Sequence, residues 1–169
     1  MVRDLNTILE IRKNNESIIS EVRFDAVLIF VKRYIEKEIE DTRCVIKADF
    51  SKAPKINSVK PYVESVIQNL LSNAIKYRHP HRTPVITITT EPVDDYICLT
   101  VSDNGLGIDT ELYKNKIFTL YQRFHNHVEG KGLGIYLIKT QVIALGGRIE
   151  LESKVDEGTV FKVYFKNSN

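Results

Sequence analysis

Apolar residues recur along the chain at helical spacing in four places. Asp25 is a candidate N-cap for the second pattern, and Ser58 and Pro61 open the third and longest. The predicted helices lie within residues 3–15, 22–41, 58–79 and 135–145.

Five other stretches alternate between apolar and polar residues, as half-buried strands do. They are "RCVIKADFS" (43–51), "PVITITTEP" (84–92), "YICLTVSD" (96–103), "GRIELES" (147–153) and "GTVFKVYF" (158–165). Helices and strands come mixed rather than as strict βαβ units, which favours an α+β fold. We expect a two-layer α/β sandwich, with a mixed sheet covered by helices on one face. The polar, glycine-rich connection of residues 103–134 is where we look for function.

Composition narrows the class of protein. The chain has 169 residues, of which 43% are hydrophobic and 27% charged, as in an ordinary globular domain. A net charge of +2 without a basic stripe argues against nucleic acid as a partner. No apolar run approaches the ~18–20 residues that cross a bilayer, so any membrane anchor would come from a segment outside this chain. Cys44 and Cys98 have no CxxC spacing, which predicts buried reduced thiols and a cytoplasmic location.

The longest predicted helix has two faces. Asn69, Asn73 and Lys76 form a narrow polar stripe, and asparagine is a poor residue for a helix interior. The stripe is either a solvated face or a pair of amide oxygens directed at a hard cation such as Mg²⁺. The opposite arc is apolar and predicted to face the core; it consists of Val63, Val66, Ile67, Leu70, Leu71, Ala74 and Ile75.

The sequence "VSDNGLGID" (101–109) ends an apolar strand in Asp103 and continues with Gly105 and Gly107. One interpretation is a simple turn, because Asp-Asn-Gly is a strong turn signal. The other places the Asp103 carboxylate in a pocket, where it accepts a hydrogen bond from an exocyclic amine such as that of adenine.

Three glycines, Gly130, Gly132 and Gly134, precede the last predicted helix. Their spacing matches neither a P-loop nor a dinucleotide fingerprint. They form either a turn or an anion site built from backbone N–H groups and the helix N-terminus, to which Lys131 and Arg123 would add positive charge. The four histidines lack ligands at metal-site spacing and are interpreted as solvated loop residues.

Taken in order, five segments resemble the motifs of one known family, the ATP-binding catalytic domain of sensor histidine kinases. This family has the Bergerat fold of the GHKL superfamily, with type II topoisomerases, Hsp90 chaperones and MutL proteins. The segments are "QNLLSNAIKY" (68–77, N box), "DNGLGI" (103–108, first glycine box), "IFTLYQRF" (117–124, F box), "GKGLGIYL" (130–137, second glycine box) and "EGTVFKVYF" (157–165, closing strand).

The resemblance implies a role for each motif residue. Asn69 and Asn73 would hold Mg²⁺, while Lys76 and Tyr77 would position the nucleotide. Asp103 would bind the adenine amine in a pocket shaped by Gly105 and Gly107 and supported by Thr159. Under a lid of roughly residues 110–131, the phosphates would lie along Gly130, Lys131, Gly132, Leu133 and Gly134, with Arg123 at the γ-phosphate.

The resemblance also implies what this chain does not carry. None of its histidines lies in the family's phosphoacceptor motif, so we expect residues 1–20 to be a remnant of the dimerisation and phosphoacceptor hairpin and residues 21–169 to be the catalytic domain. Such a piece would bind ATP without phosphorylating itself and would be monomeric. The full-length protein would be a homodimer with a response regulator as partner, and segments outside this chain could anchor it in a membrane.

Two other functions stay open at this point. One is an ATP hydrolase of the same superfamily, against which the absence of a glutamate at Asn69 argues. The other is a degenerate domain that serves only as a docking module.

Overall fold

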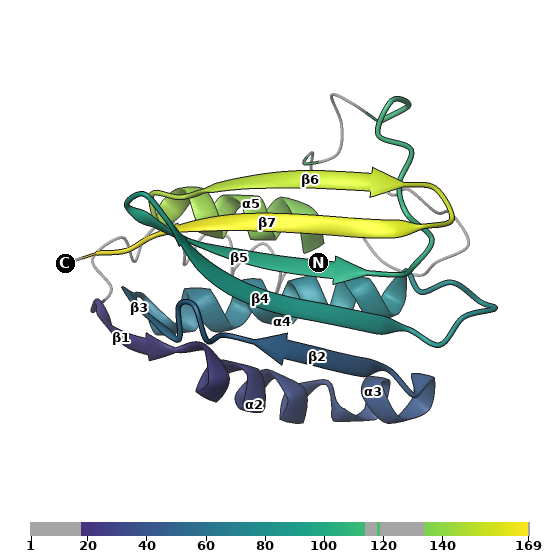
Figure 1. Ribbon diagram of the computed structural model, residues 1–169, viewed down its shortest axis with the longest axis horizontal. Coiled ribbons are helices and arrows are strands. Elements are labelled where there is room, and N and C mark those ends of the chain that lie inside the picture. Colours follow the sequence, from purple (N-terminus) through teal and green to yellow (C-terminus); the bar gives the residue numbers. More distant parts are fainter. Residues whose placement is uncertain (1–17, 114–117, 119–133, 169) are drawn as a thin grey trace, which may run out of the picture.

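The computed structural model describes residues 18–113, 118 and 134–168 (Figure 1). Its elements in chain order are β1 (Ser20–Arg23), α2 (Phe24–Tyr34), α3 (Glu36–Thr42), β2 (Val45–Asp49), β3 (Lys55–Ser58), α4 (Lys60–Lys76), β4 (Val85–Val93), β5 (Tyr96–Asp103), α5 (Gly134–Ala144), β6 (Arg148–Lys154) and β7 (Gly158–Lys166). None of the described helices combines the length and the apolar character needed to span a bilayer.

The five-stranded sheet has the order β2-β4-β5-β7-β6. β2 runs parallel to β4 and every other neighbouring pair is antiparallel, which makes the sheet mixed. In Figure 1, α4 and α5 lie behind this sheet, and the strands leave their other face uncovered by described helices. The predicted two-layer α+β architecture is therefore confirmed.

The core lies between the sheet and the helices. Ile88 of β4, Leu99 of β5 and Phe165 of β7 are fully buried and belong to one hydrophobic cluster with α2, α4 and α5. The predicted apolar arc of α4 is confirmed, because all seven of its residues are buried. Cys44 and Cys98 are buried and free, as expected.

Several predicted boundaries were wrong at the N-terminal side. The helical stretch expected within 22–41 is two helices separated at Ile35. Asp25 is not an N-cap: the cap is Arg23, and Asp25 lies in the first turn, where its Oδ1 accepts a 2.8 Å hydrogen bond from the N–H of Ala26. Ser58 does not cap α4 but ends β3, and Val59 takes the cap position.

The strands β1 and β3 were not predicted. Each has four residues, and together they form a separate antiparallel pair in which Val22 lies opposite Ile56. Both of these side chains are buried. The pairing therefore attaches β1, near the start of the described residues, to β3, the strand that directly precedes α4.

Leu70 tests the packing of α4 on the sheet, because its side chain is 1% exposed. We expect Leu70→Ala to lower the free energy of unfolding by about 2–5 kcal/mol, since the substitution leaves a cavity in a closely packed interior. Urea denaturation followed by circular dichroism measures this difference. The control is Ile29→Ala on α2, where the side chain is 57% exposed and the expected change is within about 0.5 kcal/mol. Equal effects at the two positions would contradict the described core.

Candidate functional site

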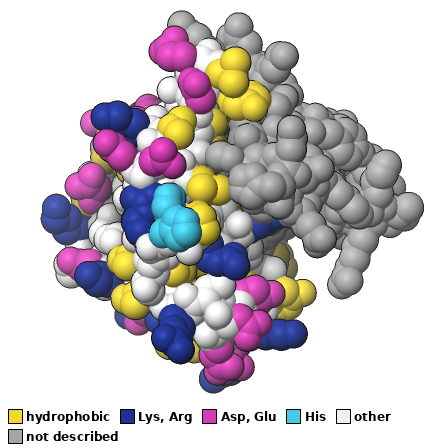
Figure 2. Space-filling view, turned by 90° about the vertical axis from the view of Figure 1, so that its right-hand side faces the viewer, with side chains coloured by type: hydrophobic (Ala, Val, Ile, Leu, Met, Phe, Trp, Pro, Cys, Tyr) yellow, Lys and Arg dark blue, Asp and Glu magenta, His cyan; other side chains and the backbone are white. Residues whose placement is uncertain are grey.

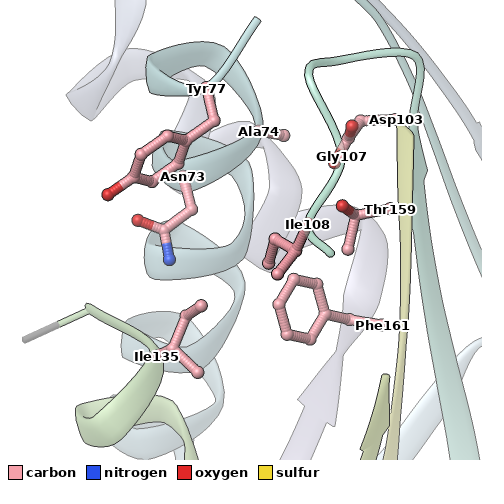
Figure 3. Close-up of a pocket in the computed structure, with 9 residues that line it drawn as sticks. All are labelled: Asn73, Ala74, Tyr77, Asp103, Gly107, Ile108, Ile135, Thr159 and Phe161. Carbon is pink, nitrogen blue, oxygen red and sulfur yellow. The ribbon is translucent and has the colours of Figure 1, made fainter. Parts of the chain in front are cut away.

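A pocket opens between α4, the segment that follows β5, the strand β7 and the start of α5 (Figure 3). It contains about 390 Å³ of empty space, part of which is open to solvent. Its lining residues are Asn73, Ala74, Tyr77, Asp103, Gly107, Ile108, Ile135, Thr159 and Phe161.

Asp103 contributes the only carboxylate among the lining residues. It is the last residue of β5, and its Oδ1 accepts a 2.9 Å hydrogen bond from the backbone N–H of Gly105. Burial raises the pKa of this carboxyl above its ordinary value of 3.8, against the opposing effect of backbone hydrogen bonds from Gly105 and Thr159. The carboxylate is therefore incompletely compensated and suited to accept a hydrogen bond from a ligand.

The segment after β5 can lie this close to α4 and β6 only because it contains glycines. A Cβ on Gly105 would lie 2.6 Å from the carbonyl oxygen of Tyr77. Gly107 has a φ of +71°, and a Cβ there would overlap the carbonyl oxygen of Lys154. A hydrogen bond of 2.9 Å from the N–H of Leu106 to Tyr77 O holds the same segment to the end of α4.

Thr159 lies on the opposite side of the pocket from α4 (Figure 3). Its hydroxyl is 2.7 Å from the Oγ of Ser153, which also accepts a 2.7 Å hydrogen bond from the N–H of Ile108. Ser153 Oγ itself donates to the carbonyl of Gly158 at 3.0 Å. Because the single hydroxyl proton of Ser153 is donated to the carbonyl of Gly158, the Thr159 hydroxyl must be the donor in the contact between Ser153 and Thr159. Its lone pairs then remain available as acceptors.

The polar stripe of α4 is not a solvated face. Asn69 and Asn73 are half-buried, and the Nδ2 of Asn69 donates a 3.0 Å hydrogen bond to the backbone oxygen of Ser65. The Nδ2 of Asn73 is buried and has no hydrogen-bond partner within the described residues. Gly134, the first residue of α5, lies against this amide, where a Cβ would come within 2.9 Å of both Asn73 side-chain atoms Oδ1 and Nδ2.

The structure thus brings together seven of the fourteen site residues singled out in the sequence. Asn73, Tyr77, Asp103, Gly107 and Thr159 line the pocket. Gly105 lies beside the pocket, where its N–H binds the Asp103 carboxylate, and Gly134 packs against the side chain of the lining residue Asn73. Asn69 and Lys76 lie on α4 outside the lining, with the Lys76 ammonium 5.5 Å from the centroid of the Tyr77 ring. Arg123, Gly130, Lys131, Gly132 and Leu133 lie outside the described residues, as does most of the expected lid of residues 110–131.

Two residues that support the pocket were missed in the sequence. The Nη2 of Arg82 donates to the backbone oxygen of Gly105 at 3.2 Å and to the backbone oxygen of Asp156. The Arg82 side chain therefore joins the segment after β5 to the β6–β7 turn. Asn104 accepts a 2.9 Å hydrogen bond from the N–H of Val85 and donates to Thr83 O at 3.0 Å. Both side chains hold backbone groups that are distant in the sequence, so no local pattern could reveal them.

His79 and His81 are the histidines of the described part of the chain and form the cyan patch in Figure 2. Their ring centroids are 5.7 Å apart, and the Nε2 of His79 is 4.0 Å from a carboxylate oxygen of Asp156. Neither of them lines the pocket beside Asp103. No group of three His, Cys, Asp or Glu residues suited to a metal occurs within the described residues.

Comparison with known proteins identifies the family. A model of the histidine kinase-, DNA gyrase B- and HSP90-like ATPases matches residues 59–169, which include all nine lining residues of the pocket. The chain belongs to this ATPase family. The matched region is accordingly a histidine kinase-like ATP-binding domain, and it contains the pocket.

Several curated relatives are more than 30% identical to this ATPase domain over the aligned residues, and two of them illustrate the similarity. Cyanobacterial phytochrome A of Nostoc sp. is 36% identical over 110 residues, which are 64% of this chain and 14% of that protein. Sensor protein RprX of Bacteroides fragilis is 33% identical over 138 residues, which are 78% of this chain and 24% of that protein. The chain therefore spans at most about a quarter of the length of these two relatives.

A solved structure, the histidine kinase AdeS of Acinetobacter baumannii, resembles this ATPase domain with a TM-score of 0.80. The likeness covers 99% of this chain and 77% of that one, at 23% identity. At this level of identity the likeness establishes the fold, which agrees with the architecture expected from the sequence.

The buried carboxyl of Asp103 makes the stability of the ligand-free ATPase domain dependent on pH. Above pH 3.8 and up to the raised pKa, the folded protein binds more protons than the unfolded chain, so the free energy of unfolding falls as the pH rises through this window. Asp103→Asn removes this loss but keeps an acceptor for the Gly105 N–H. We expect the variant to gain stability over the wild type as the pH rises through the window, measured by urea denaturation at a series of pH values.

The matched control is Asp95→Asn, at an exposed aspartate in the β4–β5 turn. Its unfolding free energy should run parallel to that of the wild type across the same pH range. If the unfolding free energy of Asp103→Asn also runs parallel to that of the wild type, burial does not disfavour the ionised Asp103 carboxylate.

Proposed function

We propose that this chain is the catalytic ATP-binding domain of a sensor histidine kinase. It would donate the γ-phosphoryl group of Mg-ATP to a histidine on a helical hairpin that is not part of the described residues. The observation that carries this proposal is the pocket, where Asn73, Asp103 and Thr159 from three separate elements meet in a domain of the ATPase family. An amide, a buried carboxylate and a hydroxyl at these places suit a nucleotide with its base at Asp103 and its phosphates toward α5.

The base would bind at the inner end of the pocket. There the Asp103 carboxylate would accept a hydrogen bond from the adenine amine, and the Thr159 hydroxyl would offer a second acceptor. Ile108, Ile135 and Phe161 supply apolar surface for the faces of the ring. Gly105 and Gly107 keep the backbone close to the base, and Tyr77 closes the side next to α4.

The phosphates would bind where α5 begins. The N-terminus of this eleven-residue helix carries partial positive charge and backbone N–H groups, which favour anions. Gly134 places this terminus directly on Asn73. We further assign Gly130, Lys131, Gly132 and Leu133 to the phosphate cradle, Arg123 to the γ-phosphate and Lys76 to charge neutralisation, on the strength of their motifs alone.

The residues of the polar stripe fit a magnesium ion. Mg²⁺ prefers oxygen ligands in octahedral geometry and retains several waters, so two side-chain amide oxygens and the phosphates suffice to hold it. Asn69 commits its Nδ2 to Ser65 O, which leaves its amide oxygen for other partners. The unpartnered Nδ2 of Asn73 provides a buried donor for a phosphate oxygen or a water beside the ion. When bound, the ion would neutralise the negative charge of the phosphates.

Phosphoryl transfer to a protein histidine requires no residue that activates water. Asn69 stands on α4 where ATP-hydrolysing relatives of this fold tend to carry a glutamate, which favours the kinase over the hydrolase. In this proposal, residues 1–20 belong to the phosphoacceptor and dimerisation hairpin and residues 21–169 to the catalytic domain. The domain itself would be monomeric and act in the cytoplasm. The full-length protein would be a homodimer that other segments could anchor in a membrane, and a response regulator would receive the phosphoryl group.

Nucleotide binding tests the metal and phosphate side of the site. We expect a non-hydrolysable ATP analogue to bind more tightly with Mg²⁺ than with EDTA in isothermal titration calorimetry. Asn73→Asp should weaken binding with Mg²⁺ by about 10–100-fold, because it disturbs a ligand of the ion and places a negative charge beside the phosphates. Asn57→Asp, the same change at an exposed position of β3, should bind as the wild type does. No heat with millimolar Mg-nucleotide would favour the docking module.

Phosphoryl transfer separates the kinase from the hydrolase. The chain is mixed with γ-labelled Mg-ATP and a separately produced hairpin that carries the acceptor histidine. We expect an acid-labile label on the hairpin, absent when the hairpin's histidine is replaced by glutamine. Steady release of phosphate with no labelled protein would establish the hydrolase instead.

A further inference from the structure

Gln141 is a buried polar residue on the face of α5 that packs against α4. Its side chain is 1% exposed, and its Nε2 donates a 2.7 Å hydrogen bond to the hydroxyl of Ser65. Its Oε1 is buried and has no hydrogen-bond partner within the described residues. The neighbouring positions Ile138 and Val142 on the same helix are fully buried and apolar.

A glutamine in this environment calls for a physical explanation. Burial of an unpaired carbonyl oxygen is unfavourable, and an apolar side chain of similar size would fill the same space without that cost. Single buried polar residues between packed helices are best known for fixing the register of one helix along another. Gln141 has the features of such a residue, since its one hydrogen bond crosses from α5 to α4.

The two helices run antiparallel, as two of their contacts show. Gly134 of α5 lies against Asn73 of α4 at the pocket, and Gln141 contacts Ser65 at the other end. Gly134 and Gln141 are seven residues apart, which places them on the same face of α5 about two turns from each other. A slip of α5 along α4 would therefore move Gly134 away from Asn73 and break the bond to Ser65 at the same time.

The same bond also acts on the polar stripe of α4. Ser65 receives two side-chain amides: Gln141 binds its hydroxyl, and Asn69 binds its backbone oxygen at 3.0 Å. Asn69 lies one turn from Ser65 and one turn from Asn73 along the helix. Ser65 thus links the register of α5 along α4 to the orientation of the Asn69 side chain.

We propose that the hydrogen bond between Gln141 and Ser65 sets the register of α5 on α4, which makes Gln141 a positioning residue for the metal and phosphate side of the nucleotide site. The bond holds Gly134 and the N-terminus of α5 against Asn73. This inference rests on the proposed function for its link to Mg-ATP, but its structural part concerns the ligand-free protein.

The experiment uses two variants that remove the bond from opposite sides, Gln141→Met and Ser65→Ala. Methionine retains the length of the side chain without an amide, and it also removes the unpaired carbonyl, so Gln141→Met should be as stable as the wild type or more so. In ¹H–¹⁵N spectra of the nucleotide-free protein, we expect both variants to shift the Gly134 amide signal and the Asn73 side-chain signals. The increase in ATP-analogue affinity caused by Mg²⁺ should fall by about 10–100-fold, while the affinity for adenosine without Mg²⁺ stays unchanged.

Ile138→Val is the matched control, because Ile138 lies on the same buried face of α5 between the two contact points and takes part in no hydrogen bond between side chains. It should lower the unfolding free energy while leaving the Mg²⁺ effect and the Asn73 signals as in the wild type. A folded Gln141→Met with wild-type signals and a wild-type Mg²⁺ effect would overturn the proposal. An equal loss of affinity for adenosine and Mg-nucleotide would do the same, since it would indicate a purely structural role.

The outcome for the proposed function is read separately. If the wild type binds no nucleotide, the proposed function fails, and the nucleotide-free spectra alone decide whether Gln141 positions Asn73 and Gly134.

Discussion

The burial of one face of α4 against the sheet determines the direction in which its other face points. Seven apolar residues of this helix lie in the core, and the polar stripe is thereby directed away from the sheet and toward α5. Because successive side chains leave a helix at fixed angles, the burial of the apolar face also fixes the direction in which Asn69 and Asn73 leave α4. The site depends on this constraint, since the other walls of the pocket come from the ends of β5 and β7, the segment after β5 and the start of α5.

Around α4, the pocket is assembled from segments that lie far apart in the chain. The segment after β5 is held to α4 by the bond from Leu106 to Tyr77, and to the β6–β7 turn by Arg82 and by the N–H of Asp156, which donates to Leu106 O at 2.7 Å. These contacts hold the Asp103 carboxyl in a partly dehydrated place where burial raises its pKa. An empty pocket therefore carries an electrostatic cost that a ligand with a hydrogen-bond donor relieves, as expected of a preorganised binding site.

Much of this arrangement could be predicted from the sequence, because long elements repeat their signal. The strands β4, β5 and β7 have eight or nine residues each, and α4 has seventeen, which is enough for periodicity to be read clearly. The four-residue strands β1 and β3 were missed because two alternations do not stand out from a loop. Asp25 was assigned as a cap because its residue type suits one, although the cap lies two residues earlier, at Arg23, and the helix begins at Phe24.

The candidate site was predictable where chemistry and motif coincide, as at Asn73, Asp103 and Thr159. It was not predictable where a side chain serves a distant backbone group. Arg82 and Ser153 act through bonds to partners whose proximity exists only in the folded chain, and Gln141 interrupts an apolar helix pattern without indicating its partner Ser65. Such residues carry no periodic signal, so only the three-dimensional arrangement reveals their part in the pocket.

The most direct test of the central claim is a crystal structure of the chain with a non-hydrolysable ATP analogue and Mg²⁺. The account predicts the adenine amine within hydrogen-bond distance of the Asp103 carboxylate and the ion beside the side-chain oxygens of Asn69 and Asn73. A nucleotide bound elsewhere, or bound in this pocket with its base away from Asp103, would contradict it.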